Sequence, residues 1–288
     1  MYFVLSMAIF GAVGVFAKYI DLSSIEIALF MSLIGSVMLF AISIITKNRL
    51  SWFAMTKNAF ALLLASIALG GNWIFLFQSY KETTIANAAL SYYFAPVLVT
   101  LMSPVVLKEK LSLKKALCVC GALLGLVFIL QSGRTGGDGN HLLGIVYGLI
   151  AAMFYAILTL TNKFIKSMNG LEITVAQLFL SSMLLIAFFP LTGGKLGLFH
   201  LSGNSMLLIW VLGILHAGVG FYLFFSGMKG LSGQSIAILS YVDPLTSLVI
   251  SALVIGESMT LLQIFGAILL LGSTFCSEVS LKMKPKMQ

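Results

Sequence analysis

Residues 236–254 read Ile-Ala-Ile-Leu-Ser-Tyr-Val-Asp-Pro-Leu-Thr-Ser-Leu-Val-Ile-Ser-Ala-Leu-Val and contain a single charged side chain, that of Asp243. A helix of about 20 apolar residues crosses the roughly 30 Å hydrocarbon core of a bilayer. The stretch therefore predicts a membrane-spanning helix. It also places a carboxylate well inside that helix, where a charge is costly and is usually retained for a function.

The whole chain has the composition of this stretch. Of its 288 residues, 60% are hydrophobic and 9% are charged, and its mean hydropathy is +1.07. A typical soluble domain is about 45–50% apolar and about 25% charged. The composition excludes a soluble globular enzyme and predicts an all-α polytopic membrane protein.

Apolar runs bounded by charged residues, by Gly, Asn or Ser clusters or by proline predict ten spans. Each is expected to be helical, because lipid offers no partner to free backbone groups. The first run, from Tyr2 to Ala17, has no basic residues before it, so we interpret it as a span and not as a cleavable signal peptide. The ten predicted spans are 2–20, 26–46, 58–80, 84–106, 113–131, 142–163, 172–191, 204–227, 230–254 and 260–279.

The cations lie between these runs and predict the orientation of the chain in the membrane. With the N-terminus inside, 13 of the 17 Lys and Arg residues fall in inner connections and 4 in outer ones: Lys18, Lys81, Arg134 and Lys195. Cytoplasmic connections carry an excess of Lys and Arg. We therefore expect a multi-pass protein of the cell membrane with both termini in the cytoplasm. The net charge of +8 is assigned to this topology, with no nucleic-acid partner.

Two halves of the chain resemble each other. Lys81, Pro96 and Glu109 recur 148 residues later as Lys229, Pro244 and Glu257. Five spans per half make the second half enter the membrane in the opposite direction, which is an inverted repeat typical of secondary transporters. The predicted organisation is a first repeat at 1–131, a Gly-rich linker at 132–140, a second repeat at 141–280 and a basic cytoplasmic tail at 281–288.

Each repeat carries a similar motif ending in glutamate. The two copies are Phe-Ala-Pro-Val-Leu-Val-Thr-Leu-Met-Ser-Pro-Val-Val-Leu-Lys-Glu (94–109) and Val-Asp-Pro-Leu-Thr-Ser-Leu-Val-Ile-Ser-Ala-Leu-Val-Ile-Gly-Glu (242–257). With the residues that follow, the chain resembles the EamA family of the drug/metabolite transporter superfamily. The first copy departs from the family pattern at Ala95 and Lys108. The resemblance implies a ten-helix carrier with cytoplasmic ends; substrates in the superfamily include amino acids, sugars, nucleotide sugars, amines and drugs.

Asp243 is the strongest candidate for substrate binding. Its charge costs about 2.5–3.5 kcal/mol at the centre of a span on insertion scales. It is a candidate to bind a substrate ammonium or to carry a coupling proton; alternatively, it caps a broken helix. Pro96 and Pro244 each remove one helical hydrogen bond, and we interpret the pair as bends beside the site, with simple packing kinks as the alternative.

Aromatic and polar residues in the same spans complete the candidate site. Aromatic faces and hydroxyl groups bind amines by cation–π contacts and hydrogen bonds, although Tyr and Trp also populate membrane interfaces. For the histidine of the eighth span, a proton relay and a hydrogen-bonded place inside the bundle both remain open. The predicted substrate-binding residues besides Asp243 are Tyr92, Trp73, Tyr241, Asn72, Gln78, His216 and Tyr222.

Other polar residues receive structural interpretations. Glu26 and Glu172 are expected to begin helices, and Glu109 and Glu257 are expected to cap the helices that follow them. Gly121-x-x-x-Gly125 and Gly144-x-x-x-Gly148 permit close helix approach. The three cysteines lie in apolar runs and are expected to be small buried hydrophobic residues: Cys118, Cys120 and Cys276.

These features predict a secondary transporter that moves a small metabolite, an amino acid or related amine, by alternating access, with export as the expected direction. Sugars, nucleosides and other polar metabolites are the alternative substrates, and the proton is the candidate coupling ion. ATP hydrolysis on this chain is disfavoured because no GxxxxGK[ST] motif occurs. An intramembrane enzyme is disfavoured because the histidines are scattered and no paired aspartates lie in the spans. A channel fits the kinks and the buried acid less well. No cofactor or metal is expected, and the protein is predicted to be a monomer or dimer.

Overall fold

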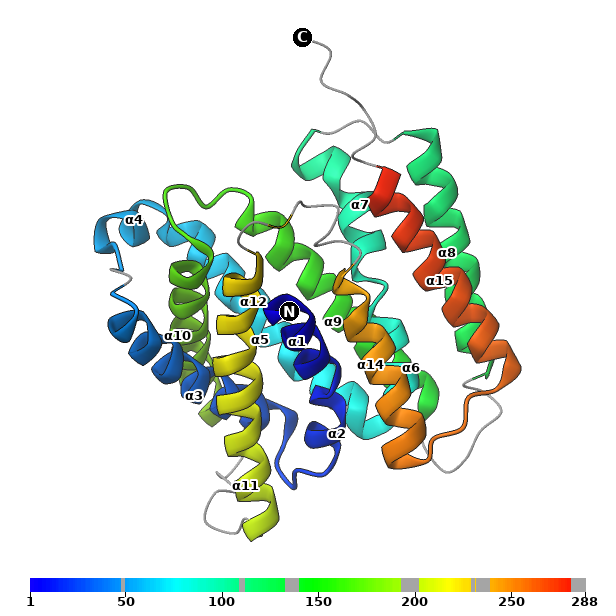
Figure 1. Ribbon diagram of the computed structural model, residues 1–288, viewed down its shortest axis with the longest axis horizontal. Coiled ribbons are helices and arrows are strands. Elements are labelled where there is room, and N and C mark those ends of the chain that lie inside the picture. Colours follow the sequence, from blue (N-terminus) through cyan, green and yellow to red (C-terminus); the bar gives the residue numbers. More distant parts are fainter. Residues whose placement is uncertain are drawn as a thin grey trace.

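The computed structural model describes residues 1–47, 50–108, 112–132, 140–192, 202–228, 231 and 239–280. All elements in these ranges are helical (Figure 1). The first half of the chain forms α1 (Tyr2–Gly11), α2 (Val13–Lys18), α3 (Ser24–Ile45), α4 (Trp52–Lys57), α5 (Ala59–Glu82), α6 (Ile85–Tyr92), α7 (Ala95–Val106) and α8 (Leu113–Ser132). The second half forms α9 (His141–Asn162), α10 (Gly170–Phe188), η1 (Phe189–Thr192), α11 (Gly203–Val211), η3 (Leu212–Gly220), α12 (Phe221–Met228), α14 (Val242–Ile250), η4 (Ser251–Ile255) and α15 (Leu261–Ser280).

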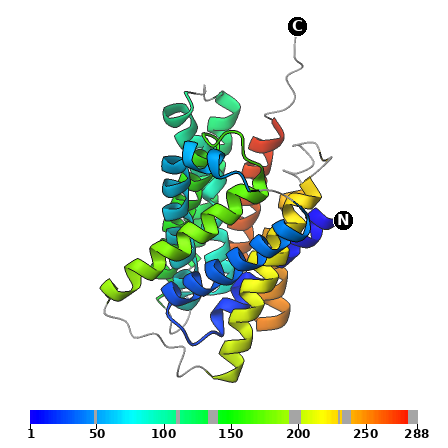
Figure 2. The same cartoon turned by 90° about the vertical axis from the view of Figure 1, so that its left-hand side faces the viewer.

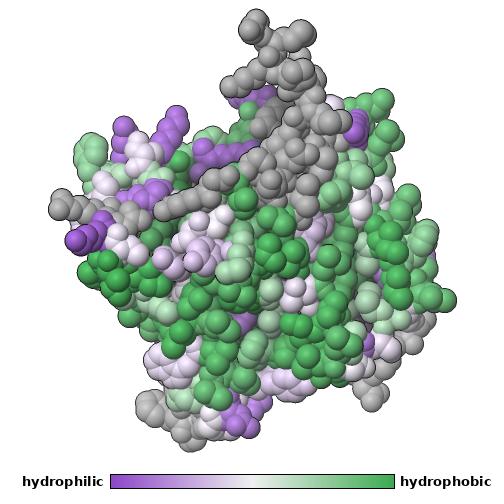
Figure 3. All heavy atoms as spheres, viewed as in Figure 1, coloured by the Kyte–Doolittle hydropathy of each residue, from purple (hydrophilic) through white to green (hydrophobic). Residues whose placement is uncertain are grey.

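The helices have the length and polarity of membrane spans. Within the described ranges, six helical segments are long and apolar enough to cross a bilayer: Ser24–Ile45, Ala59–Glu82, Ile85–Val106, His141–Asn162, Gly170–Thr192 and Gly203–Met228. Tyr2–Lys18, Val242–Ile255 and Leu261–Cys276 are shorter apolar helices. The chain is thus a polytopic helical membrane protein. Figure 3 shows hydrophobic side chains over most of the visible face, with hydrophilic ones gathered toward its upper and lower edges.

Local sequence explains where two of the long helices begin. Glu26 accepts a hydrogen bond from the backbone N–H of Ser23 at 2.9 Å, and the Ser23 hydroxyl accepts one from the N–H of Glu26. Glu172 and Asn169 form the same reciprocal arrangement at the start of α10. Such capping boxes satisfy free N–H groups at a helix start. The prediction that both glutamates begin helices is confirmed.

Helices from the two halves of the chain pack together. α5 lies along α9, α8 along α15, and α3 against α10, while α6 contacts both α9 and α14 (Figures 1 and 2). Gly148 lets α9 approach α6 closely, since a Cβ at this position would lie 2.0 Å from the hydroxyl of Ser91. Gly125 of α8 similarly packs against the backbone of Gly266 in α15. The close approach predicted from these glycines is confirmed.

The cysteines correct one expectation. Cys120 and Cys276 are exposed and Cys118 is half-buried, so they are not buried core residues. They lie on α8 and α15, whose outer faces carry exposed aliphatic side chains such as Leu117, Leu124 and Ile268. Their apolar character therefore suits contact with lipid and not burial in protein.

Candidate functional site

Interruptions in three helical segments surround the candidate site. α1 ends at Gly11 and α2 begins at Val13, while α6 ends at Tyr92 and α7 begins at Ala95. α14 begins at Val242 after a turn at Tyr241. Pro96 and Pro244 lie in the first turns of α7 and α14, where a residue without an N–H is tolerated because helix starts leave N–H groups unpaired. The symmetric prolines thus mark the two points at which helices restart.

Asp243 and Tyr93 join the two halves of the chain at these interruptions. The hydroxyl of Tyr93 donates a hydrogen bond to Oδ1 of Asp243 at 2.5 Å. Tyr93 is the residue directly after α6, and Asp243 lies in the first turn of α14. Both residues are half-buried. Among the described residues, no Lys or Arg forms an ion pair with Asp243.

Further tyrosines surround this pair. The ring of Tyr92 lies 5.8 Å from that of Tyr93 and 5.7 Å, edge-on, from that of Tyr155 in α9. Tyr80 of α5 is buried, with its hydroxyl in electrostatic range of the Asp243 carboxylate. We call Tyr80, Tyr92, Tyr93, Tyr155 and Asp243 the Asp243 cluster. It combines one carboxylate with several aromatic faces, the chemistry that binds organic cations.

Asn72 supports the cluster from α5. Its side-chain amide lies close to Tyr92 and donates to the carbonyl oxygen of Ala151 at 2.8 Å. Asn72 is almost fully buried, so the bond to Ala151 provides a partner for an amide that would otherwise be costly to bury. The structure therefore brings together three of the predicted residues: Asp243, Tyr92 and Asn72.

Several other predicted residues lie in different surroundings. The Tyr241 hydroxyl donates to Thr274 Oγ1 of α15 at 3.0 Å, away from the bond between Tyr93 and Asp243. Gln78 accepts a hydrogen bond from Ser24 and donates to Glu82 at 2.9 Å. Trp73 is buried in the main hydrophobic core, which also contains Tyr80 of the Asp243 cluster, and Tyr222 packs against the same core from α12.

His216 occupies a fully buried position in η3, the widened helical segment between α11 and α12. Its ring meets that of Phe16 edge-on at 5.3 Å. The carbonyls of Ile9 and Val211 lie close by, but neither ring nitrogen makes a hydrogen bond of good geometry within the described part of the chain. A proton relay and a hydrogen-bonded place inside the bundle both remain predictions for His216.

Tyr80, Tyr93 and Tyr155 are cluster members outside the predicted substrate-binding residues. Tyr93 carried a usable signal, because it stands 148 residues before Tyr241, the same spacing that relates Pro96 to Pro244. The two tyrosines nevertheless have different partners in the structure. Tyr80 and Tyr155 lie on helices whose apolar pattern gives no indication of which face meets the Asp243 cluster.

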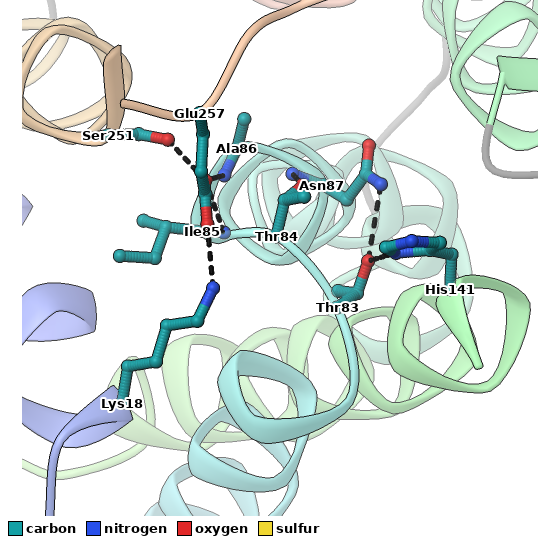
Figure 4. A network of polar contacts seen from close by, with 9 residues as sticks. All are labelled: Lys18, Thr83, Thr84, Ile85, Ala86, Asn87, His141, Ser251 and Glu257. Carbon is teal, nitrogen blue, oxygen red and sulfur yellow. Dashed lines mark hydrogen bonds and ion pairs between the residues drawn. The ribbon is translucent and has the colours of Figure 1, made fainter. Parts of the chain in front are cut away.

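A second polar group surrounds Glu257, in the connection between η4 and α15 (Figure 4). The Nζ of Lys18 lies 2.7 Å from one carboxylate oxygen. The backbone N–H groups of Ile85 and Ala86 donate to the carboxylate at 2.8 and 3.4 Å, and the hydroxyl of Ser251 also donates to it. We call these five residues the Glu257 cluster.

This geometry corrects the assignment of Glu257. It caps a helix as expected, but that helix is α6, which precedes it by 172 residues in sequence at Ile85, and not α15, which follows it. The start of α15 is capped instead by Thr260 and Gln263. The backbone N–H of Thr260 donates to the side chain of Gln263 at 2.7 Å, and the N–H of Gln263 donates to the hydroxyl of Thr260 at 3.2 Å. Glu109, the counterpart of Glu257 in the first half, lies outside the described residues.

The charge state of Glu257 follows from its partners. Burial raises the pKa of its carboxyl group, but the hydrogen bonds from Lys18, Ser251 and the Ile85 N–H outweigh burial and hold the pKa below its ordinary value. A carboxylate with a cationic partner and backbone donors favours its ionised form. Glu257 is therefore charged at neutral pH.

More hydrogen bonds tie the start of α6 to the second half of the chain. The Thr83 hydroxyl lies 2.9 Å from Nδ1 of His141 and accepts a bond from Asn87 at 3.2 Å (Figure 4). Gln263 donates to Oδ1 of Asn87 at 2.7 Å. No group of three or more His, Cys, Asp or Glu side chains suited to a metal occurs in the described part of the chain.

Comparison with known proteins assigns the family. The sequence profile of the EamA-like transporter family matches residues 1–131 and again residues 142–278. The chain belongs to the EamA-like transporter family. It is 30% identical to the uncharacterized transporter YxxF of Bacillus subtilis (strain 168), over 93% of this chain and 85% of the relative. It is also 27% identical to an uncharacterized transporter of Archaeoglobus fulgidus, over 93% and 92% of the two chains.

Structure comparison agrees at the level of the fold. A solved crystal structure aligns with a TM-score of 0.64 at 18% identity, covering 97% of each chain. At this identity the likeness concerns the fold alone. The family and the names of its relatives indicate a membrane transporter and not an enzyme.

Proposed function

We propose that this EamA-family protein is a secondary transporter for a small metabolite bearing an amino group, an amino acid or related amine, with Asp243 as the cation-binding residue. It works by alternating access of ten spans arranged as two inverted repeats, 1–131 and 141–280, which are joined by residues 132–140. Both termini, including the basic tail at 281–288, lie in the cytoplasm, and the expected direction is export.

The observation that supports this proposal most directly is the hydrogen bond between Tyr93 and Asp243. A carboxylate at this depth is rarely kept without a partner, and its partner among the described residues is a neutral phenol and not a Lys or Arg. The negative charge thus stays available to a cation. A substrate ammonium would pair with Asp243 while the faces of Tyr92 and Tyr93 contribute cation–π attraction.

The location of the pair supports a transport role. Tyr93 comes from the first half and Asp243 from the second, and each lies at a helix interruption beside one of the symmetric prolines. Carriers place substrate sites near the membrane midplane at interrupted helices between repeats. Relative motion of the halves would therefore alter the site itself. Asp243 is also the group that would carry a coupling proton.

The test is uptake into proteoliposomes, screening amino acids, polyamines, nucleosides and sugars with and without a pH gradient. We expect saturable uptake of an amine, reduced at least about tenfold by Asp243→Asn because a charged partner in a desolvated site is lost. Tyr93→Phe should weaken transport as well. Tyr241→Phe is the matched control, since it removes a hydroxyl from the equivalent repeat position without touching Asp243.

The screen also separates the alternatives. Uptake confined to sugars or nucleosides, with Asp243→Asn active, would replace the amine by a polar uncharged substrate held by Asn72 and the tyrosine hydroxyls. A non-saturable flux would indicate a channel. Product formation without flux would indicate an enzyme.

A further inference from the structure

We propose that the Glu257 cluster is the gate on the outer side of the transporter, and that the ion pair between Lys18 and Glu257 must break before the site opens to the outside. The inference rests on the proposed function and on the orientation predicted from the cation distribution, which puts Lys18 and residues 255–259 in outer connections. In the present structure this gate is closed.

The cluster fastens the two halves of the chain together. Lys18, Ile85 and Ala86 belong to the first half, whereas Ser251 and Glu257 belong to the second (Figure 4). The contact between Lys18 and Glu257 is the one side-chain ion pair found among the described residues. Separating the halves at this end therefore has to break both this pair and the cap on α6.

The exposure of the two charges suits a contact that opens and closes. The Lys18 side chain is 30% exposed and that of Glu257 is 10% exposed. The Lys18 ammonium is already partly exposed. Breaking the ion pair therefore does not leave a fully buried, unpaired cation, which is what makes breaking buried pairs costly. Glu257 moves toward water when the connection before α15 swings outward.

The start of α6 is built to survive the loss of Glu257. Thr84, the residue before α6, accepts a hydrogen bond from the N–H of Asn87 at 3.1 Å. That is an ordinary N-cap, made entirely within the first half. Glu257 is thus a second, removable cap that uses the N–H groups of Ile85 and Ala86.

A row of polar residues on one face of α14, which we call the seam, runs from the Glu257 cluster toward Asp243. Asp243, Ser247 and Ser251 follow one another at intervals of four residues, so they share one face of α14 and the start of η4. Ser247 is 1% exposed, and its hydroxyl has no hydrogen-bond partner within the described part of the chain. Gly11 of α1 closes the seam, since a Cβ there would lie 2.5 Å from the carbonyl oxygen of Asp243. Opening the gate should expose Ser247.

The experiment measures that exposure directly. Cys118, Cys120 and Cys276 are replaced by alanine and Ser247→Cys is introduced as a reporter of nearly equal size. Its labelling rate with a charged, membrane-impermeant methanethiosulfonate is measured in right-side-out and inside-out vesicles. We expect Lys18→Met to raise labelling from the outside about tenfold, equivalent to about 1.4 kcal/mol of lost closure. Glu257→Gln should act likewise, and Lys18→Arg should remain close to the parent.

Lys81→Met provides the matched control on the same side of the protein. Lys81 donates to the carbonyls of Ile20, at 3.2 Å, and Leu22, so it ties the first half only to itself. Unchanged labelling in Lys18→Met and Glu257→Gln, in protein that still elutes as a single folded species, would overturn the gate. An equal rise in Lys81→Met would overturn it too. A rise confined to inside-out vesicles would mean that the cluster faces the cytoplasm and would overturn its assignment to the outer side.

The labelling assay needs no substrate, so its result is independent of the transport screen. Failure of every amine in uptake, together with a Lys18-dependent rise in labelling, rejects the proposed substrate and retains the gate. Amine transport that depends on Asp243, with no effect of Lys18→Met on labelling, rejects the gate alone.

Discussion

Asp243 and Glu257 are carboxylates in neighbouring parts of the chain, yet their partners differ in kind. Asp243 accepts a hydrogen bond from a phenol, whereas Glu257 accepts bonds from a lysine, two backbone N–H groups and a serine hydroxyl. The first arrangement leaves the carboxylate without a Lys or Arg partner among the residues that the structure describes. The second neutralises the charge of Glu257 and holds the two halves of the chain together at this point. One residue is therefore suited to ligand binding and the other to fastening.

The pH dependence of stability should report the state of Glu257. Its folded-state pKa lies below the unfolded value, so its stabilisation is complete above the ordinary glutamate pKa of about 4.3 and is lost as the pH falls through the folded value. Glu257→Gln should destabilise the protein by about 2 kcal/mol, the scale of hydrogen bonds to charged groups. The difference in Tm between parent and variant should stay constant from pH 8 to about 5 and shrink below pH 4. A difference that already disappears near pH 6 would contradict the ionised, capped state.

At the residue scale, sequence separation decides what could be predicted. Glu26 and Glu172 meet partners three residues away, so a local pattern identified their roles. Glu257 meets Ile85 across the two halves of the chain, and a single sequence carries no sign of that contact. The sequence gives equally little sign that Glu257 pairs with Lys18, from which it is separated by most of the chain. Asp243 was found because a charge in an apolar run is conspicuous without knowledge of its partners.

At the scale of elements, interruptions matter more than the spans themselves. The fourth apolar segment divides into α6 and α7 beside Pro96, and α14 restarts beside Pro244. The first segment also divides, at Ala12, where no proline marks the break. Prolines identified two of these sites from the sequence. The third lies beside Gly11, where α1 meets the backbone of α14 at close range.

The contact between α1 and α14 should tolerate no side chain at Gly11. Gly11→Ala places a Cβ 2.5 Å from the carbonyl oxygen of Asp243 and 2.8 Å from Cβ of Thr246. Overpacking of this kind costs about 1–3 kcal/mol, so we expect a lower Tm and faster labelling of the Ser247→Cys reporter. Gly203→Ala is the control, because its added Cβ meets nothing within 4 Å. Equal Tm values and equal labelling rates of the two variants would show that the contact between α1 and α14 does not close the seam.

At the scale of the molecule, the sequence was sufficient to predict the structural class of the protein but not which helices pack against each other. Run length and charge scarcity predicted a helical polytopic protein, because the bilayer itself imposes both features. Which helices pack together depends on small residues and on side-chain shape, which hydropathy does not encode. Gln78 illustrates the limit: it suits a binding site by type, but its side chain bonds to Ser24 and Glu82.

Substrate counterflow in proteoliposomes tests the central claim most directly, because exchange across one alternating site distinguishes a carrier from a channel and needs no knowledge of the coupling ion. Vesicles are preloaded with an unlabelled amine identified by the uptake screen and diluted into a trace of labelled amine. The parent protein and Tyr241→Phe should accumulate label transiently above the equilibrium level, whereas Asp243→Asn should not rise above protein-free vesicles. Counterflow by Asp243→Asn equal to that of the parent would contradict the assignment of Asp243 as the cation-binding residue of the carrier.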